Sequence, residues 1–279
     1  MNHQKRILAI NDISCFGKCS LTAAIPILSA AGIETCALPT AVLSTHTAFS
    51  GYTFRDLTED LLPQAQHWES LGLTFDGIYT GYLGSLLQVD AVETILDMFK
   101  TPFVLVDPVM GDNGKLYAGF DVSYVVEMKR LVKRADIIVP NITEGAMLAG
   151  VPYETGEHTT CYIQVIIEKL QALCAGNIVL TGIHMKDGVV GTAVWDKNAL
   201  SVIEQQRFDV FYSGTGDVFA SALAAAMMLG YNIKKAAELA AVYVETCILE
   251  TRKTSGDRNY GLNFEPCIKQ LLQDLEGGL

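Results

Sequence analysis

The residues with the clearest chemical meaning lie late in the chain, at Ser213-Gly-Thr-Gly-Asp217. This turn leads into a run of good helix formers from Val218 to Leu229, which Gly230 ends as a C-cap. A glycine-rich turn that opens a helix presents unpaired backbone N–H groups at the positive end of the helix dipole, and this suits an anion. Asp217 is the only early charge of this apolar helix. We expect it to accept a proton from a substrate; the alternative is that it only caps the helix.

Further acids and amides follow two other apolar segments. Asp107-Pro-Val-Met-Gly-Asp112 comes directly after Phe103–Val106, and Pro140-Asn-Ile-Thr-Glu144 comes after Ile137–Val139. Hard divalent cations prefer oxygen ligands of this kind, and magnesium bound to phosphates takes few protein carboxylates. Phosphoryl transfer needs a metal, an anion cradle and a base for the nucleophile's proton. The chain offers candidates for all three.

Each of these acids also has a purely structural interpretation. Asp112 stands beside Asn113-Gly114, where it can simply form a turn. Asp107 precedes a proline and can do the same. Asn141 and Glu144 have the spacing of a helix N-terminus that satisfies itself in a capping box. The sequence alone leaves both the ligand-binding and the structural interpretation open.

Two common nucleotide-binding motifs fail on their spacing. A Walker A motif ending in Gly17-Lys18 would need glycine where Asp12 stands and serine or threonine where Cys19 stands. A dinucleotide motif at Gly214-Thr-Gly216 would need glycine at the position of Phe219. These motifs therefore do not explain the chemistry.

Composition describes a globular protein with a large core. Of the 279 residues, 50% are hydrophobic and 18% are charged, and the formal net charge of -11 disfavours nucleic acid and anionic membranes as partners. No apolar run reaches membrane-spanning length, and the first apolar run is too short for a signal peptide. The seven cysteines are scattered without a C-x-x-C pair, so we expect free thiols and a cytoplasmic protein.

Apolar runs alternate with helical periodicity along the chain. We expect strands at 7–10, 36–42, 75–79, 103–106, 137–139 and 178–180, the last ending in Thr181-Gly182, and an antiparallel hairpin from 189–195 and 199–204. We expect helices at about 20–31, 57–71, 89–99, 121–134, 141–149, 159–174, 218–229, 233–250 and 266–275, with Pro63 near a helix boundary. This order predicts one α/β domain whose mainly parallel sheet places ligands at the carboxyl ends of its strands.

With these motifs the chain resembles the ribokinase-like superfamily, whose signature is a Gly-x-Gly-Asp turn opening a helix, here Gly214-Thr-Gly-Asp217. Within it, the chain is most similar to the vitamin B6 kinases. The resemblance runs from Ile7 to about Glu250, and its more specific pieces are 44–47 (Ser-Thr-His-Thr), 80–84 (Thr-Gly-Tyr-Leu-Gly), 107–112 and 140–144. It implies a single domain, 1–279, built as a three-layer sandwich with a mainly parallel central sheet, and a small flap at about 43–55.

Two differences separate the chain from the related hydroxymethylpyrimidine kinases. Those enzymes usually have a Gly-Met-Leu turn where Gly81-Tyr-Leu83 stands here. They also carry Lys-Ser-Gly after the Asp-Pro-Val-Met motif, where this chain has Gly111-Asp-Asn-Gly114. Both differences favour the B6 branch. The alternatives are a hydroxymethylpyrimidine or sugar kinase of the same superfamily, or a non-catalytic binder of a vitamer or nucleotide.

The resemblance implies roles for individual residues. Asp217 would deprotonate the 5′-hydroxymethyl group of a B6 vitamer, while Gly214, Thr215 and Gly216 would hold the transferring phosphoryl group. Residues expected to bind the vitamer are Asp12, His46, Thr47, Tyr82 and Tyr117. Residues expected to bind ATP are Asp107, Asn141, Glu144, Thr181 and Gly182, and those expected to hold Mg²⁺ are Asp107, Asp112 and Glu144. The resemblance also allows a monovalent cation near the turn and implies a homodimer.

Asp12 departs from the family pattern. Many B6 kinases place a serine at this position after the first strand, where it bonds substituents of the ring. A carboxylate can bond the 3-hydroxyl or the protonated ring nitrogen instead, so the preferred vitamer stays open. His46 has a similar ambiguity, because it can contact the substrate or simply bond a loop carbonyl.

Overall fold

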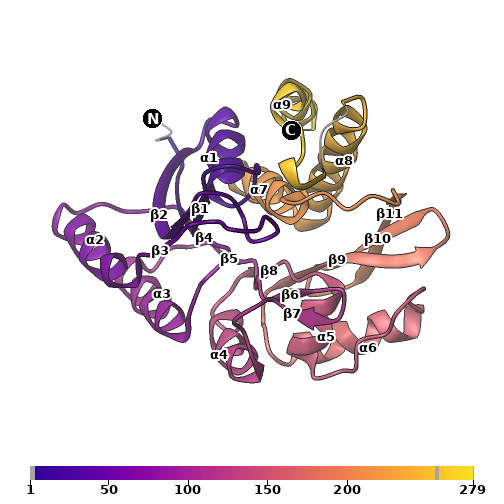
Figure 1. Cartoon of the computed structure of the whole chain (residues 1–279), viewed down its shortest axis with the longest axis horizontal. Helices are drawn as coiled ribbons and strands as arrows, with labels where there is room; N and C mark the ends of the chain where they lie inside the picture. Colours follow the sequence, from indigo (N-terminus) through magenta and orange to yellow (C-terminus); the bar gives the residue numbers. More distant parts are fainter. Residues whose placement is uncertain (1–3, 255–257, 279) are drawn as a thin grey trace. The chain divides into compact units, whose positions relative to one another are not determined.

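The computed structural model describes residues 4–254 and 258–278 (Figure 1). The chain divides into two compact units. The first consists of Met1–Pro102 and Asp209–Leu279, and the second of Phe103–Phe208. The single domain expected from the sequence stays a prediction.

The strands of the first unit form a mostly parallel sheet around β1 (Arg6–Ser14). β1 pairs in parallel with β2 (Glu34–Leu43) and β4 (Gly77–Thr80), and the short β3 (Phe54–Asp56) pairs antiparallel with β2. Residues 7–10 of β1 are all fully buried. This continuous apolar run is typical of a strand that is covered on both faces of its sheet.

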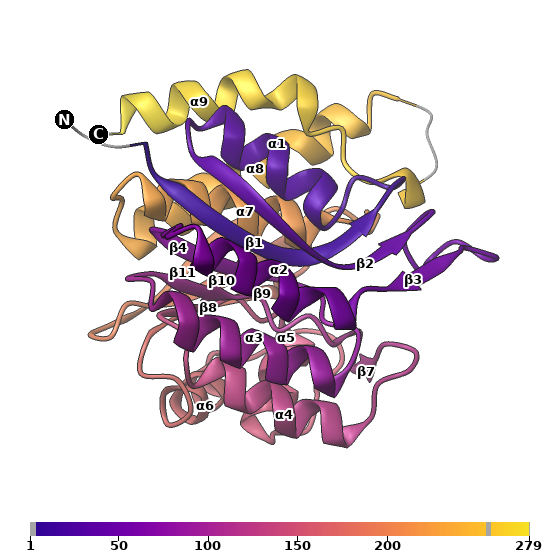
Figure 2. The same ribbon diagram turned by 90° about the vertical axis from the view of Figure 1, so that its left-hand side faces the viewer.

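Helices cover both faces of this sheet (Figure 2). One side carries α1 (Leu21–Ala30), α7 (Thr215–Met228), α8 (Ile233–Thr251) and α9 (Ile268–Gly277); the other carries α2 (Thr58–Ser70) and α3 (Leu86–Phe99). α7 packs against both α1 and α8. Residues 218–226 of α7 are all buried, which explains why this helix is apolar all round.

The second unit has its own mixed sheet. β5 (Val104–Val106), β8 (Ile137–Ile138) and β9 (Asn177–Lys186) are parallel, and β10 (Val189–Trp195) and β11 (Leu200–Gln206) continue the sheet antiparallel. β6 (Gly111–Asp112) and β7 (Lys115–Leu116) form a separate small hairpin. The helices are α4 (Val122–Val132), α5 (Ile142–Ala149) and α6 (Thr160–Gln171).

The structure confirms the expected α/β class, with mainly parallel strands flanked by helices, and the hairpin of β10 and β11. Two details were wrong. Pro63 lies inside α2 and not at its boundary. β9 does not end at Thr181-Gly182 but runs on to Lys186, and its pairing with β10 shifts register between Gly191 and Ala193. Gly182 has φ 70°, so the Thr-Gly pair marks an irregularity within a strand.

The described helices include none that is both long and apolar enough to cross a membrane. All seven cysteines lie among the described residues as free thiols, with Cys19, Cys174, Cys247 and Cys267 buried and Cys15 and Cys161 exposed.

Candidate active site

The turn before α7 has a backbone that only glycine fits well. Gly214 has φ 77°, and a Cβ at this residue would lie 2.3 Å from the carbonyl oxygen of Lys18. Gly214 is also the N-cap of α7 and offers no capping side chain to the N–H groups of the first turn. A helix start of this kind, without a capping side chain, is suited to an anion.

Asp217 lies in the first turn of α7, three residues after the N-cap. The position that caps the helix is thus occupied by Gly214, and the capping alternative for Asp217 does not hold. The Asp217 carboxylate accepts a long hydrogen bond of 3.4 Å from Asn11 Nδ2. Burial raises the pKa of Asp217 to about 6, with Asp12 adding to the rise and the backbone N–H of Ser20 opposing it. Such a group is ionised at neutral pH and still accepts a proton readily.

Asn11 is locked in place next to this carboxylate. Its Oδ1 accepts hydrogen bonds from the main-chain N–H of Tyr82 at 2.8 Å and of Asp12 at 2.9 Å. Its side chain lies against Gly81, where a Cβ would come within 2.1 Å of Asn11 Nδ2. Asn11 therefore orients Asp217, and we did not identify it from the sequence. Its only sequence signal is its place beside Asp12 in the first strand.

Asp12 is almost fully buried, with 4% of its surface exposed. Its two carboxylate oxygens accept hydrogen bonds from Ser20 Oγ at 2.5 Å and Ser14 Oγ at 2.8 Å. Burial raises the pKa of Asp12, and the two serine hydroxyls oppose that rise. Neither serine was expected to belong to the site.

The segment expected to form a flap follows β2 and is tied to the C-terminal part of the chain. His46 donates from Nε2 to the carbonyl oxygen of Asn259 at 2.7 Å, which is the bond to a loop carbonyl given as its alternative role. Phe49 stacks on Tyr260 with ring centroids 6.2 Å apart, and Phe16 meets Tyr260 edge-on at 5.2 Å. Thr47 is exposed and Tyr82 is partly buried. Their contact with a vitamer stays a prediction.

In the second unit, Glu144 and Asn141 form the capping box of α5. Asn141 Oδ1 accepts from the Glu144 N–H at 3.0 Å, and Glu144 Oε2 accepts from the Asn141 N–H at 2.9 Å. Glu144 Oε1 accepts from the Met110 N–H at 3.0 Å. Burial raises the pKa of Glu144, and these backbone hydrogen bonds oppose the rise. The structural interpretation of this pair is therefore confirmed, which leaves fewer lone pairs for a ligand.

The other site residues expected in the second unit differ in burial and in hydrogen bonding. Asp112 accepts two hydrogen bonds from Asn113, at 2.8 Å from its N–H and 2.9 Å from its Nδ2, so the turn chemistry is present. Asp107 is buried and Tyr117 is 40% exposed. Thr181 bridges in parallel to Asn141, which brings these two expected ATP ligands together beside Gly182.

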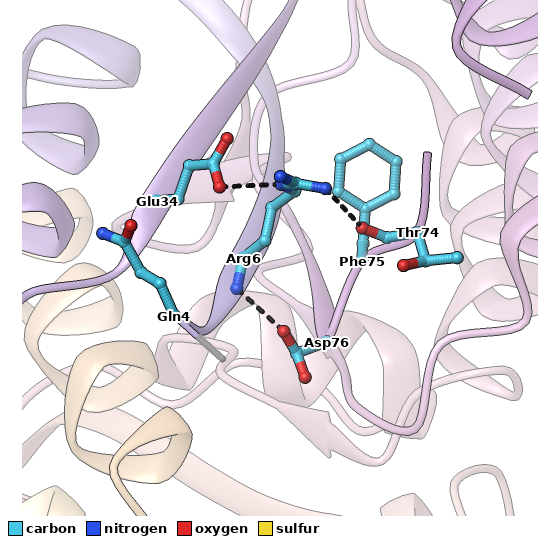
Figure 3. A pocket seen from close by; sticks show the side chains of 6 residues that line it. All are labelled: Gln4, Arg6, Glu34, Thr74, Phe75 and Asp76. Atoms are coloured by element: carbon cyan, nitrogen blue, oxygen red, sulfur yellow. Dashed lines mark hydrogen bonds and ion pairs between the residues drawn. The ribbon is translucent and has the colours of Figure 1, made fainter. Parts of the chain in front are cut away.

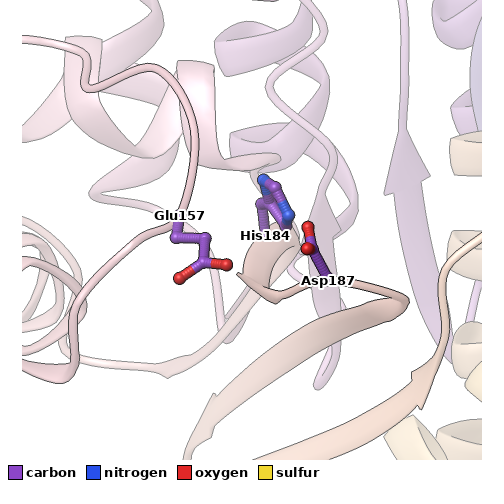
Figure 4. Close-up of side chains that lie close together, drawn as sticks. All are labelled: Glu157, His184 and Asp187. Atoms are coloured by element: carbon purple, nitrogen blue, oxygen red, sulfur yellow. The ribbon is translucent and has the colours of Figure 1, made fainter.

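The carboxylates of the second unit fit a water-rich magnesium site better than a closed cage. Asp107, Asp112 and Glu144 supply oxygen ligands only, as Mg²⁺ prefers, but they do not form a tight three-ligand cluster in the described part of the chain. The one such cluster found among the described residues is Glu157, His184 and Asp187 (Figure 4). There, Arg207 already donates to His184 Nε2 at 2.7 Å, which occupies one of the two ring nitrogens that a cation could use.

A cavity of about 230 Å³ lies beside the first residues of β1 and is unsuited to the chemistry (Figure 3). Arg6 is its main polar group. Its Nε pairs with Glu34 at 2.9 Å, and its backbone N–H donates to Asp76 at 2.9 Å. Because the charge of Arg6 is already matched and the cavity lies at the opposite end of β1 from Asp12, we do not assign a substrate to it.

Residues 19–262 match the family model for phosphomethylpyrimidine kinase. The crystal structure of pyridoxal kinase from Lactobacillus plantarum is 32% identical, with a TM-score of 0.90 over 99% of both chains. A candidate phosphomethylpyrimidine kinase from Bacteroides thetaiotaomicron, in a crystal form with pyridoxal, is 33% identical, with a TM-score of 0.91 over 96% of both chains.

Among curated proteins, pyridoxal kinase from Dictyostelium discoideum is 26% identical over 257 residues, covering 86% of this chain and 82% of the relative. The region that matches the family model, residues 19–262, contains the Gly214 turn and Asp217, whereas Asn11 and Asp12 lie before it. The chain belongs to the phosphomethylpyrimidine kinase family.

Proposed function

We propose that this protein transfers the γ-phosphoryl group of ATP to the 5′-hydroxymethyl group of a vitamin B6 vitamer, with Asp217 as the general base. The observation that carries the proposal is Asp217 itself. It stands beside a side-chain-free helix N-terminus, held by Asn11, and burial raises its pKa to about 6. The substrate class is supported by relatives that are named pyridoxal kinases and by the neighbour crystallised with pyridoxal.

The protein contributes a proton acceptor, Asp217, and a group of backbone N–H donors that bind the phosphoryl group. The hydroxyl proton of the vitamer passes to the Asp217 carboxylate while the hydroxyl oxygen forms a bond to the γ-phosphorus. The bond between that phosphorus and the bridging oxygen breaks, and ADP leaves with the electron pair. The backbone N–H groups at Gly214, Thr215 and Gly216 would stabilise the charge on the transferring group, at a helix start that lacks a capping side chain.

Magnesium belongs to the proposal as the partner of the ATP phosphates. Asp107 and Asp112 would hold it with water, and Glu144 would support it through its place in the capping box. When bound, it would neutralise charge on the phosphates. We also propose that Asn141, Thr181 and Gly182 lie against ATP. A monovalent cation near the Gly214 turn and a homodimer are further proposals from family resemblance. We propose a cytoplasmic location from the seven free thiols.

A hydroxymethylpyrimidine kinase is the second candidate, and the match to the phosphomethylpyrimidine kinase model favours it. A non-catalytic binder is harder to reconcile with the site, because binding a vitamer or nucleotide does not require a base such as Asp217. Tyr82 beside Gly81 and the substitution of Gly111–Gly114 for Lys-Ser-Gly favour the B6 vitamer.

The test is ADP release with Mg²⁺ and ATP, measured in parallel with pyridoxal, pyridoxine, pyridoxamine, hydroxymethylpyrimidine and ribose. Selective turnover of a B6 vitamer is the expected result. Turnover of the pyrimidine or the sugar alone would move the substrate but keep the mechanism. Binding of vitamer and ATP without any ADP release would overturn the proposed activity.

A further inference from the structure

Ser20 has a backbone conformation that L-amino acids rarely take, with φ 52° and ψ -135°. Residues in such regions persist where the surrounding structure fixes them, and they concentrate at functional sites. Ser20 directly precedes α1, but its side chain makes no capping hydrogen bond to that helix. Helix capping therefore does not explain a serine at a position where glycine would be unstrained.

The polar groups of Ser20 instead face two carboxylates. Its hydroxyl donates to Asp12 at 2.5 Å, and its backbone N–H faces Asp217 and lowers the pKa of that group. Ser14 donates to the other oxygen of Asp12 at 2.8 Å. Ser20 thus joins the candidate base to a second carboxylate that is held inside the first unit.

The other titratable groups nearby do not replace Asp12 as a source of charge. Burial and the two carboxylates raise the pKa of Cys19, and burial raises the pKa of Tyr82 to about 12, so both side chains are neutral near pH 7. His46 faces Asp12 from the flap segment and opposes the rise of the Asp12 pKa that burial causes. Among the largest influences on Asp217, the charge that raises its pKa is that of Asp12.

We propose that Asp12 is the electrostatic partner of the base Asp217, held beside it by Ser20 and Ser14, and that it acts through Asp217 and not as a ligand of the vitamer. This inference rests on the proposed function. A second negative charge beside a carboxylate favours protonation, which makes Asp217 a stronger proton acceptor. Asp12 is only 4% exposed and both its oxygens already accept hydroxyl hydrogen bonds. Asp12 and Ser20 are therefore positioning residues.

The first test is Asp12→Asn, which removes the charge and keeps the shape. With that charge gone, Asp217 ionises at lower pH, so the acid limb of kcat/KM for the vitamer moves to lower pH. The plateau of kcat falls about three- to tenfold, as expected for a weaker base, while KM for the vitamer stays within about twofold. A tenfold rise in KM with an unmoved acid limb would show that Asp12 binds the vitamer, and would overturn the proposal.

The second test is Ser20→Gly, with Lys18→Gly as the matched control. Both substitutions put glycine into the same loop at a residue with positive φ, but only Ser20 bonds Asp12. Ser20→Gly keeps the backbone N–H, relieves the strained backbone and removes the hydroxyl. We expect it to keep thermal stability and to move the acid limb in the same direction as Asp12→Asn. An equal shift in Lys18→Gly would assign the effect to loop flexibility and would contradict the proposal.

A readout without turnover separates this inference from the proposed function. The carboxyl carbon of Asp217 can be titrated by NMR in protein labelled with ¹³C-aspartate, with Asp217→Asn used to assign the resonance. We expect Asp217 to titrate at lower pH in Asp12→Asn than in the natural protein. An unchanged titration would overturn the coupling even if the protein phosphorylates a vitamer. A shifted titration in a protein that turns over no vitamer would sink the proposed function alone.

Discussion

Two helix N-termini of this protein carry a carboxylate at the same position and use it differently. Asp217 stands three residues after the N-cap of α7, and Glu144 stands three residues after the N-cap of α5. Burial raises the pKa of both groups. The side chain at the N-cap makes the difference, because α5 has Asn141 there and α7 has Gly214.

Asn141 turns its helix end into a closed structural unit. It accepts the Glu144 N–H, Glu144 accepts the Asn141 N–H in return, and a further backbone N–H from Met110 binds the same carboxylate. Gly214 offers its helix no capping side chain, and the Asp217 carboxylate accepts a long bond from Asn11 Nδ2 and faces the backbone N–H of Ser20. We propose that the carboxylate at the capped start of α5 stabilises the fold, while the carboxylate at the uncapped start of α7 accepts a proton.

Of the substitutions at these two helix starts, Asp217→Asn should have the largest effect on activity. Turnover should fall at least about a hundredfold, the usual scale for loss of a general base, while ATP still binds. Stability at pH 7.5 should rise. A carboxyl with a folded-state pKa of about 6 loses stability as pH rises from its ordinary pKa of 3.8 through 6, and the neutral amide avoids that loss.

The corresponding gain is on the order of 2–3 kcal/mol above pH 6, measured by urea unfolding of the two proteins. Kinetics with pyridoxal and MgATP provide the activity readout. A variant with near-normal turnover would remove Asp217 from its assigned role. A variant that is inactive but less stable would instead point to a structural role.

Gly214→Ala should have the next largest effect, because it adds a side chain to the open helix end. Its Cβ would lie 2.3 Å from the Lys18 carbonyl oxygen, and φ 77° is strained for alanine. We expect a loss of stability of about 1–3 kcal/mol and a fall in kcat of tenfold or more. Gly216→Ala is the matched control, since a Cβ there meets no atom within 4 Å. Equal effects of the two variants on stability would contradict the close approach.

Glu144→Gln should have a smaller effect of opposite sign, because it removes the same buried charge but also gives up backbone hydrogen bonds that Glu144 accepts from Asn141, Met110 and Gly111. An amide cannot accept at both positions where Glu144 accepts backbone N–H groups, so one donor is left unpaired. We expect a stability loss of about 1–3 kcal/mol, against a gain for Asp217→Asn. Thermal unfolding of the two variants side by side is the measurement. A stabilised Glu144→Gln would show that the capping box does not hold α5.

The residues that could be predicted from the sequence are those whose partners lie close by along the chain. The Asn141 and Glu144 spacing indicated a capping box, and the Gly214 turn indicated an open helix N-terminus; both contacts are local. The α/β order was also predictable, because a continuous apolar run indicates the buried strand at 7–10 and apolar residues at helical spacing indicate the helices.

The residues that were missed depend on long-range contacts and on the backbone. Asn11 reaches Asp217 across 206 positions, and no local pattern indicates that contact. Ser20 matters because of its unusual φ and ψ, which residue type does not reveal. His46 bonds Asn259 through a main-chain oxygen, so side-chain chemistry alone left its partner open. Pro63 was misplaced because tertiary packing tolerates a proline inside α2.

The central claim is that Asp217 must be ionised to accept the hydroxyl proton. The most direct measurement is the pH dependence of kcat/KM for pyridoxal at saturating MgATP. It runs from about pH 4.5 to about pH 8.5, in steps small enough to define a single titration. Because burial raises the pKa of Asp217 to about 6, activity should fall below about pH 6 with the slope of a single proton. A profile that stays flat through pH 6 down to the limit of folding would contradict the account.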